Sequence, residues 1–224
     1  MRIFAATSFF EKETMQEVIN KILTNAVSLF CKYGIKSVTM DDIAVELGIS
    51  KKTLYQCFAN KADLVQQTIE QIIRVDCLIV KTIQSSNRNA IDEMFAIAEH
   101  VYQQLNAVNL TTIYDLHKYY PQSWKILEEH RLKFIQITIF NNLKKGIEQG
   151  YYRTDLEPHL VALYYLAKAQ ALVNDHNFAK YHYTPVELFT ELFKYHIYGI
   201  ASEKGRIYLE ANMAKINAFH HAKN

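Results

Sequence analysis

The sequence predicts an all-α protein in which an N-terminal three-helix helix-turn-helix domain is joined to a larger helical domain. Apolar residues recur at intervals of three and four along most of the chain, which is the spacing of amphipathic helices. Six glycines and three prolines among 224 residues are few for the turns that sheet proteins require. Half of the residues are hydrophobic, so the chain can bury a substantial core.

The first clear helical pattern begins after Met15. Its apolar face carries seven residues, and Gly34 offers a C-terminal cap. The first ten residues carry one charged side chain and no small-residue cleavage site follows, which argues against a signal peptide. We interpret residues 1–14 as a flexible arm or as a segment upstream of a second start. The apolar face consists of Ile19, Ile22, Leu23, Ala26, Leu29, Phe30 and Tyr33.

Two short helices joined by a tight turn are expected next. Thr39, followed by Asp42 three residues later, has the form of a capping box. Gly48 can adopt the left-handed conformation that ends a helix, and Ser50 can cap the following helix. Two short capped helices around such a turn predict a helix-turn-helix, and with the preceding helix they form a domain over residues 15–60.

The second helix of this motif is expected to expose a basic face. Residues 50–62 contain three lysines and no acidic residue. Lysines that neutralise phosphates release counterions, helix N-termini offer N–H groups to phosphate oxygens, and exposed side chains of this helix can meet base edges in the major groove. An alternative is that the lysines form an ordinary solvated face. The expected DNA-binding residues are Thr39, Ser50, Lys51, Lys52, Thr53, Tyr55, Gln56 and Lys61.

This segment resembles the DNA-binding segment of the TetR family. The shared pattern is an Ala-x-x-Leu-Phe helix, a Gly, a Thr, Ile-Ala, Gly-x-Ser, Leu-Tyr-x-x-Phe and a Lys. By this resemblance Thr39, Tyr55 and Lys61 contact phosphates. Lys52 and Cys57 depart from the common residues, so the base preference of the family does not carry over. The matching residues are Ala26, Leu29, Phe30, Gly34, Thr39, Ile43, Ala44, Gly48, Ile49, Ser50, Leu54, Tyr55, Phe58 and Lys61.

Residues 61–224 are expected to form a second domain of mostly longer helices. Pro121 suits a first helical turn and Gly150 suits a C-terminal cap. In the TetR family this part of the chain binds a small molecule and forms the dimer, so the resemblance implies a ligand-binding and dimerisation domain. The expected helices span residues 61–85, 89–106, 111–120, 121–149, 158–175 and 185–201, and an amphipathic segment follows residue 205.

The central helices are rich in aromatic residues, which favours a largely apolar ligand pocket with a few polar groups. An alternative is that these aromatic residues and the histidine among them are ordinary core residues. The sequence indicates no cofactor, and it does not name the small-molecule effector. The candidate pocket residues are Tyr102, Tyr114, His117, Trp124, Phe134, Ile137, Asn141 and Tyr164.

The last long helices carry more apolar residues than one buried face needs. Packing them against their symmetry mates as a four-helix bundle would form a homodimer, as in the TetR family. The alternative is that they form intrachain core. The apolar residues in question are Leu160, Tyr164, Ala167, Ala171, Val186, Phe189, Leu192, Phe193, Ile197 and Ile200.

Other classes of protein have little support in the sequence. No nucleophile elbow, phosphate loop or paired-carboxylate signature occurs, so we expect no catalytic site. The nine histidines are scattered and no cysteine joins them at ligand spacing, so we expect no metal site. Apolar runs of membrane length are lacking. Cys31, Cys57 and Cys77 do not form a disulfide framework, which fits a reducing cytoplasm.

These features predict a ligand-responsive transcriptional regulator, a repressor that a small molecule releases from a palindromic DNA operator. The effector would change the spacing of the two recognition helices, with the helix of residues 61–85 as the lever. The alternative is a helical ligand-binding or adaptor protein that no longer binds DNA specifically. Residues 1–75 carry nine basic and eight acidic side chains, so DNA affinity would depend on a few placed residues.

Overall fold

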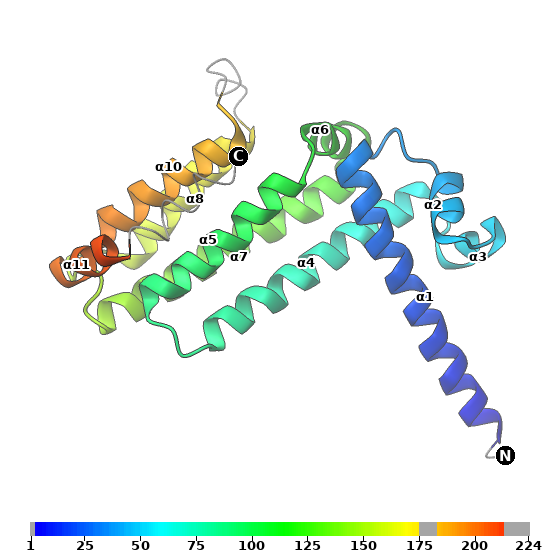
Figure 1. Ribbon diagram of the computed structural model, residues 1–224, viewed down its shortest axis with the longest axis horizontal. Coiled ribbons are helices and arrows are strands. Elements are labelled where there is room, and N and C mark those ends of the chain that lie inside the picture. The colour runs from blue at the N-terminus through cyan, green and yellow to red at the C-terminus, as the bar shows by residue number, and fades with distance from the viewer. Residues whose placement is uncertain (1–2, 175–182, 213–224) are drawn as a thin grey trace. The chain divides into compact units, whose positions relative to one another are not determined.

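The structure, a computed structural model, is built almost entirely from helices (Figure 1). It describes the backbone of residues 3–174 and 183–212 and the side chains of residues 15–171 and 183–212. The all-α fold is confirmed, since the only β pairing within these ranges is an isolated bridge between Tyr152 and Ala201. The helices are α1 (Ile3–Tyr33), α2 (Met40–Leu47), α3 (Lys51–Cys57), α4 (Lys61–Ser85), α5 (Ala90–Ala107), α6 (Leu110–Tyr119), α7 (Pro121–Glu148), α8 (Pro158–Asn174), α10 (Pro185–Ile200) and α11 (Glu203–Ala211).

The predicted arm over residues 1–14 falls on residues whose side chains lie outside the described part of the chain. Helix α1 already begins at Ile3. The start of the first domain at residue 15 therefore stays a prediction.

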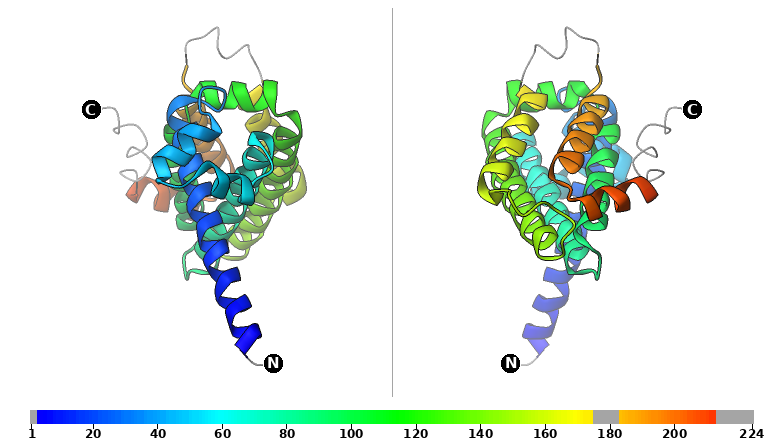
Figure 2. Two further views of the ribbon diagram at one scale, coloured as in Figure 1. Left: turned by 90° about the vertical axis from the view of Figure 1, so that its right-hand side faces the viewer. Right: turned by 90° about the vertical axis from the view of Figure 1, so that its left-hand side faces the viewer.

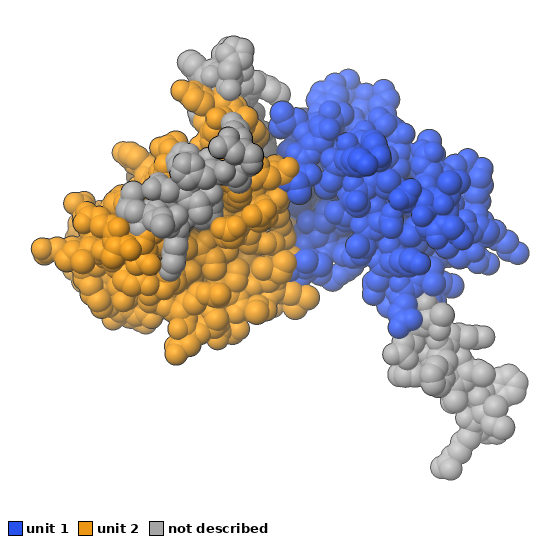
Figure 3. Space-filling view, viewed as in Figure 1, with its two compact units in different colours: residues 1–75, 107–127 blue, residues 76–106, 128–224 orange. Residues whose placement is uncertain are grey.

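The chain divides into two compact units (Figure 3). Unit 1 comprises residues 1–75 and 107–127, and unit 2 comprises residues 76–106 and 128–224. This division differs from the domain boundary that we expected between residues 60 and 61. The first part of α4, the whole of α6 and the start of α7 belong to unit 1.

Contacts between residues distant in the sequence explain this difference. Leu116 of α6 lies in the same buried cluster as the residues of α1 to α4. The Thr112 hydroxyl donates to the Phe30 carbonyl oxygen at 2.5 Å, and the Asp115 carboxylate accepts from the Lys36 backbone N–H at 2.7 Å. These two pairs are separated by 82 and 79 residues, so no local sequence pattern indicates them.

The core of unit 1 is formed by side chains from α1, α2, α3, α4 and α6. Figure 2 shows the short helices α2 and α3 beside α1. Most of the predicted apolar face of α1 is buried or partly buried in this core. Tyr33 is the exception, since it is 51% exposed at the last residue of the helix. The fully buried residues that α1, α2, α3 and α4 contribute include Ile22, Leu23, Ala26, Ile43, Leu54 and Leu64.

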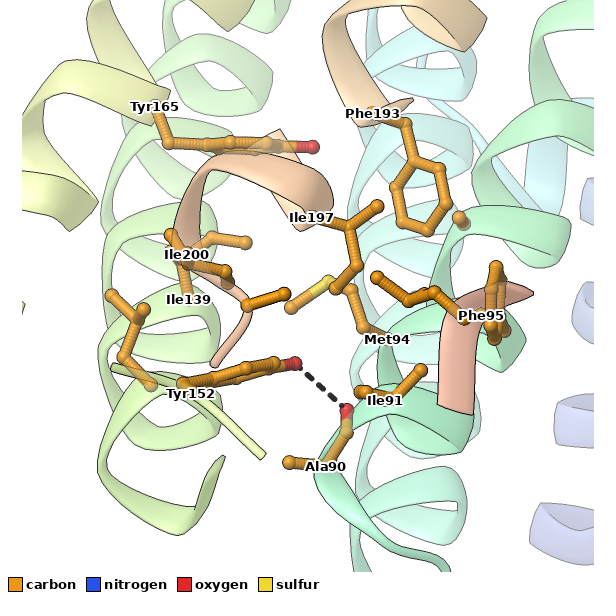
Figure 4. Close-up of a cluster of buried hydrophobic side chains, with 14 of the residues drawn as sticks. Ala90, Ile91, Met94, Phe95, Ile139, Tyr152, Tyr165, Phe193, Ile197 and Ile200 are labelled. Atoms are coloured by element: carbon orange, nitrogen blue, oxygen red, sulfur yellow. Dashed lines mark hydrogen bonds between the residues drawn. The ribbon is translucent and has the colours of Figure 1, made fainter. Parts of the chain in front are cut away.

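The core of unit 2 is formed by side chains from α5, α7, α8, α10 and α11 (Figure 4). One close contact in it requires a glycine. A Cβ atom at Gly146 of α7 would lie 2.0 Å from the ring of Tyr152, so the missing side chain lets this ring pack directly on the helix. The buried core residues include Met94, Phe95, Ile139, Leu143, Tyr152, Phe193 and Ile197.

A buried polar network joins α5 to α7 in unit 2. The Glu93 carboxylate, 3% exposed, accepts from Asn142 Nδ2 at 3.0 Å and from Lys145 Nζ at 2.6 Å. Asn142 Nδ2 also donates to the Ala90 carbonyl oxygen at 2.9 Å, and its Oδ1 accepts from the Tyr152 hydroxyl at 2.8 Å. Buried polar groups are costly unless they are hydrogen-bonded, so this network fixes how the two helices pair.

In the described part of the chain, no helix combines the length and the apolar character needed to cross a membrane. The same residues contain no group of three or more His, Cys, Asp or Glu side chains that could hold a metal ion. Cys31, Cys57 and Cys77 are free thiols, each half-buried.

Candidate nucleic-acid interface and ligand site

Helix α2 begins with a complete capping box. The Thr39 hydroxyl accepts from the Asp42 backbone N–H at 3.1 Å, and the Asp42 carboxylate accepts from the Thr39 backbone N–H at 2.8 Å. The Thr39 hydroxyl also donates to the same carboxylate at 2.7 Å. These hydrogen bonds from Thr39 hold the pKa of Asp42 below its usual value. The capping box predicted from the sequence is therefore confirmed.

The turn between α2 and α3 depends on a left-handed glycine. Gly48 has φ of 64°, a conformation that side chains other than Asn and Asp adopt only at a cost. The Ile49 N–H donates to the Ala44 carbonyl oxygen at 3.0 Å, which closes the end of α2. Ser50 then caps α3 by accepting from the Thr53 N–H at 3.0 Å. The direction of α3 is thus set by contacts within a few residues.

Helix α3 presents one apolar and one polar face. Leu54 is fully buried in the core of unit 1. Lys51, Lys52, Tyr55 and Gln56 are exposed on the other side. Thr53 is half-buried, and its hydroxyl lies 2.8 Å from the Ser50 hydroxyl. The side chains that we expected to meet DNA are therefore mostly free of the core, with Thr53 the least accessible.

The basic face of α3 has an acidic neighbour that the sequence pattern did not indicate. Lys51 Nζ lies 2.5 Å from the Asp41 carboxylate of α2, and both side chains are largely exposed. The hydrogen bond to Asp41 raises the pKa of Lys51. Exposed ion pairs of this kind contribute only about 0–1 kcal/mol and weaken with salt, so a phosphate can replace Asp41 as the partner.

Lys61 has a different environment from the other two lysines. It is the first residue of α4, it is half-buried, and its Nζ donates to the Lys36 carbonyl oxygen at 3.3 Å. Burial lowers the pKa of Lys61, and the carboxylates of Asp115 and Asp42 oppose this shift. In this structure Lys61 joins α4 to the segment after α1, and it is less available to a phosphate than Lys52.

The eight predicted pocket residues are divided between the two units. Three of them belong to unit 1, where His117 and Trp124 form an edge-to-face contact at 5.2 Å and the Tyr114 hydroxyl accepts from Lys118. The other five belong to unit 2. Of these five, Tyr102 is buried in the core and Phe134 is half-buried. Ile137, Asn141 and Tyr164 are exposed, and the buried amide next to Asn141 is that of Asn142.

The structure shows a buried polar pair in unit 2 that sequence reasoning missed. His196 of α10 and Tyr165 of α8 are both buried, with ring centroids 4.5 Å apart in an edge-to-face contact. Among the residues that the structure describes, the His196 Nε2 atom has no hydrogen-bond partner. Burial lowers the pKa of His196 to about 4, with Lys168 contributing in the same direction, and burial raises the pKa of Tyr165 to about 12. Helical spacing could have placed His196 on the buried face, since Phe193, Ile197 and Ile200 share it.

The outward faces of α8 and α10 carry large apolar side chains. Leu160, Leu163 and Tyr164 of α8 are 45–68% exposed, and Tyr195 of α10 is 75% exposed. A shallow hollow on α10 is lined in part by Tyr195 and Gly199, and it includes none of the eight predicted pocket residues. Among the α10 residues that we expected as surplus, Phe189, Phe193, Ile197 and Ile200 are buried in the core of unit 2 itself.

Comparison with known proteins gives a match over the motif just described. Residues 22–68 match the family described as bacterial regulatory proteins, tetR family. The chain is 29% identical over 109 residues to the uncharacterized HTH-type transcriptional regulator YvaF of Bacillus subtilis, which covers 48% of this chain and 57% of that protein. It is 22% identical over 151 residues to the HTH-type transcriptional repressor KstR2 of Mycobacterium tuberculosis, which covers 63% and 72% of the two chains. The match to YvaF thus spans little more than half of that relative.

Solved structures share the fold over most of the chain. A gamma-butyrolactone receptor described as ArpA-like matches with a TM-score of 0.63 at 16% identity, covering 92% of this chain and 98% of the other. A TetR family regulator from Agrobacterium tumefaciens matches with a TM-score of 0.64 at 16% identity, covering 84% and 100%. A putative transcriptional regulator from Saccharomonospora viridis in complex with choline gives a TM-score of 0.63 at 19% identity, covering 84% and 100%. At these identities the likeness concerns the fold alone.

Proposed function

This chain belongs to the TetR family of bacterial regulatory proteins, and we propose that it is a ligand-responsive repressor that binds a palindromic DNA operator as a homodimer. The family and the relative named a transcriptional repressor indicate a DNA-binding regulator rather than an enzyme. The observation that carries the proposal is the capped α2–turn–α3 motif, because α3 buries Leu54 and leaves its polar face exposed. Its site of action would be the cytoplasm, where bacterial DNA lies.

The exposed face of α3 would read the DNA. Lys52 and Gln56 are four residues apart on one helical face, so both can reach base edges in the same major groove. Lys51 would exchange Asp41 for a phosphate, and the Tyr55 hydroxyl would donate to another phosphate. Lys61 would hold the start of α4 in place and contact DNA at most through a rearranged side chain.

Thr39, Ser50 and Thr53 would act mainly through the helix starts. Their hydroxyls are already engaged in the caps of α2 and α3, so they fix the N-terminal N–H groups from which a phosphate can accept hydrogen bonds. These three residues therefore position the motif, and they add little sequence preference of their own.

Exposed apolar side chains on α8 and α10 support the homodimer. Leu160, Tyr164 and Tyr195 lie on the outward faces of these helices, where they would otherwise meet water. Two copies joined through these faces would form an isologous interface. The two α3 helices would then reach half-sites about 34–36 Å apart, and the operator would be a palindrome.

The buried His196–Tyr165 pair supports the binding of a small molecule. His196 is neutral near pH 7, because its pKa is about 4, and its unpaired Nε2 can hydrogen-bond to a ligand without an ionic partner. Tyr165 belongs to the same buried cluster as Phe95, Phe189 and Phe193, whose rings would enclose an apolar body. We therefore expect an apolar effector with one hydrogen-bonding group. Helix α4, which contributes residues to both units, is the element through which binding would change DNA affinity.

The proposal is tested by selecting binding sites from randomised duplex DNA with the purified protein. We expect a palindromic motif to emerge. Affinity for the selected sequence should fall with salt on a log–log slope of roughly −4 to −7, which corresponds to about five to eight phosphate contacts. A motif without two-fold symmetry would contradict the proposed dimer.

Two matched variants distinguish the loss of a specific DNA contact from the general effect of removing one positive charge. Lys52→Ala should weaken binding to the selected sequence by about tenfold, within the range for one base contact, and reduce discrimination at one position of each half-site. Lys133→Ala removes an exposed lysine of α7 and should leave binding unchanged. If the selection yields no motif and both variants bind every duplex equally weakly, the chain is instead a ligand-binding or adaptor protein that has lost specific DNA binding.

A further inference from the structure

Five polar side chains from three helices meet in unit 2, apart from the residues discussed above. Helix α4 contributes Asp76 and Cys77, α5 contributes His100 and Gln104, and α7 contributes His130. Asp76 Oδ1 lies 3.1 Å from His100 Nε2 and accepts from the Gln104 amide. The Cys77 thiol lies beside the imidazole of His130, with 3.6 Å between Cys77 Sγ and His130 Nε2. A nucleophile and a base are thus within hydrogen-bond reach of each other.

The His130 ring is held in place and is able to accept a proton. It stacks on the Phe134 ring with centroids 5.3 Å apart and an interplanar angle of 23°. Burial lowers the pKa of His130, so the ring is mostly neutral near pH 7, while the Asp76 carboxylate favours the imidazolium that forms when the ring takes up a proton. Thiolates, rather than thiols, are the nucleophiles in cysteine chemistry, and a neighbouring imidazole is one of the groups that generate them.

The other two cysteines provide an internal comparison. Burial raises the pKa of the Cys31 thiol and of the Cys57 thiol, which disfavours their thiolates. In the described part of the chain neither thiol has a histidine as a hydrogen-bond partner, and the Cys57 thiol instead donates to the Met15 sulfur at 3.8 Å. All three cysteines are half-buried, so their solvent exposure would not account for a difference in reactivity.

We propose that Cys77 and His130 form a site for covalent modification by soft electrophiles, such as small α,β-unsaturated carbonyl compounds. His130 takes the thiol proton, and the sulfur lone pair forms a bond to the β-carbon of the electrophile as its carbon–carbon π bond breaks. The resulting enolate takes up a proton at the α-carbon, and His130 returns to its neutral form. The reaction needs no oxidant or reductant. It depends on unit 2 alone, so it holds whether or not the chain binds DNA.

The test uses the full-length protein and methyl vinyl ketone as the probe. The protein is treated with limiting reagent, quenched at intervals and digested, and the rate of adduct formation at each cysteine is read by peptide mass spectrometry. We expect Cys77 to react about tenfold faster than Cys31 and Cys57. His130→Gln should lower the rate at Cys77 about tenfold and leave the other two rates unchanged.

His159→Gln is the matched control. His159 also stacks on a phenylalanine, since its ring lies 4.2 Å from that of Phe140, but no cysteine is bonded to it. This variant should leave all three rates unchanged. If His130→Gln unfolds the protein, the rates at Cys31 and Cys57 will rise together, and His130→Asn then takes its place in the same assay. The proposal is overturned if Cys57 or Cys31 reacts faster than Cys77 in the wild type, or if a folded His130 variant retains the wild-type rate at Cys77.

Discussion

The helix-turn-helix motif of unit 1 and the interior of unit 2 differ in the sequence distance over which their important polar contacts act. In unit 1, the caps of α2 and α3 join residues three positions apart, as Thr39 and Asp42 do. In unit 2, the network around Asn142 joins residues 49 to 52 positions apart along the chain. The surface proposed to bind DNA is therefore shaped by local rules, whereas the interior proposed to bind the effector is shaped by packing between distant segments. We therefore expect substitutions in the core of unit 2 to lower the free energy of unfolding more than substitutions in the helix-turn-helix motif.

The largest effect is expected at Gly146 in unit 2. Gly146→Ala places a Cβ atom 2.0 Å from the Tyr152 ring, so the ring must move and the hydrogen bond from the Tyr152 hydroxyl to Asn142 is strained or lost. Overpacking typically costs about 1–3 kcal/mol, and a buried polar group left without its partner costs a further 1–3 kcal/mol, so we expect a loss of about 3 kcal/mol. Urea unfolding followed by circular dichroism measures the change.

A double-mutant cycle identifies the cause of that loss. In a Tyr152→Leu background the ring is absent, so adding Gly146→Ala should cost less than about 1 kcal/mol. An equal penalty in both backgrounds would mean that the ring contact is not responsible, and the proposed reason for the glycine would be wrong.

The next effect concerns the buried His196 and pH. Its folded-state pKa is about 4, below the unfolded value of 6.5, so the unfolded chain binds the proton first as pH falls. Stability from neutral His196 is complete above pH 6.5 and declines down to about pH 4, by about 1.4 kcal/mol per pH unit. His196→Phe should remove this part of the slope, as measured by urea unfolding at pH 7, 6 and 5. Identical slopes for the variant and the wild type would contradict the assignment.

The smallest effect is expected at the turn of unit 1. Gly48→Ala introduces a side chain where φ is 64° and no other atom lies within 4 Å, so the expected loss of about 1 kcal/mol comes from the backbone alone. Gly48→Asn should cost less, because Asn adopts this conformation more readily. Thermal unfolding of the two variants provides the comparison. A loss for Gly48→Ala as large as that for Gly146→Ala would break the contrast between the units.

The same contrast explains what the sequence could predict. Apart from the start of α1, the helix boundaries follow from short patterns, as do the Thr39 capping box and the left-handed Gly48, and the all-α class with its helix-turn-helix is confirmed. The Lys51–Asp41 pair spans ten residues and two helices, so a run of lysines without acids gave too simple a picture of the charge. The placement of α6 in unit 1 depends on hydrogen bonds between residues about eighty positions apart.

The interior of unit 2 was the hardest part to predict. Aromatic content suggested pocket residues, but it does not distinguish a side chain that faces inward from one that faces water. Asn141 and Asn142 show the problem, since the first is exposed and the second is fully buried in the network. The role of His196 could not be predicted from the sequence. It depends on the Nε2 atom having no hydrogen-bond partner among the described residues, and only the three-dimensional packing reveals this.

The Lys51–Asp41 pair has a consequence for how such a protein would find its operator among other sequences. Contact with arbitrary DNA depends almost entirely on cations that meet phosphates. Because Asp41 already holds one ammonium group of α3, each encounter with an unrelated sequence gains less from that lysine. The protein would leave unrelated DNA sooner and sample more of the chromosome in a given time, at the cost of a slightly weaker final complex.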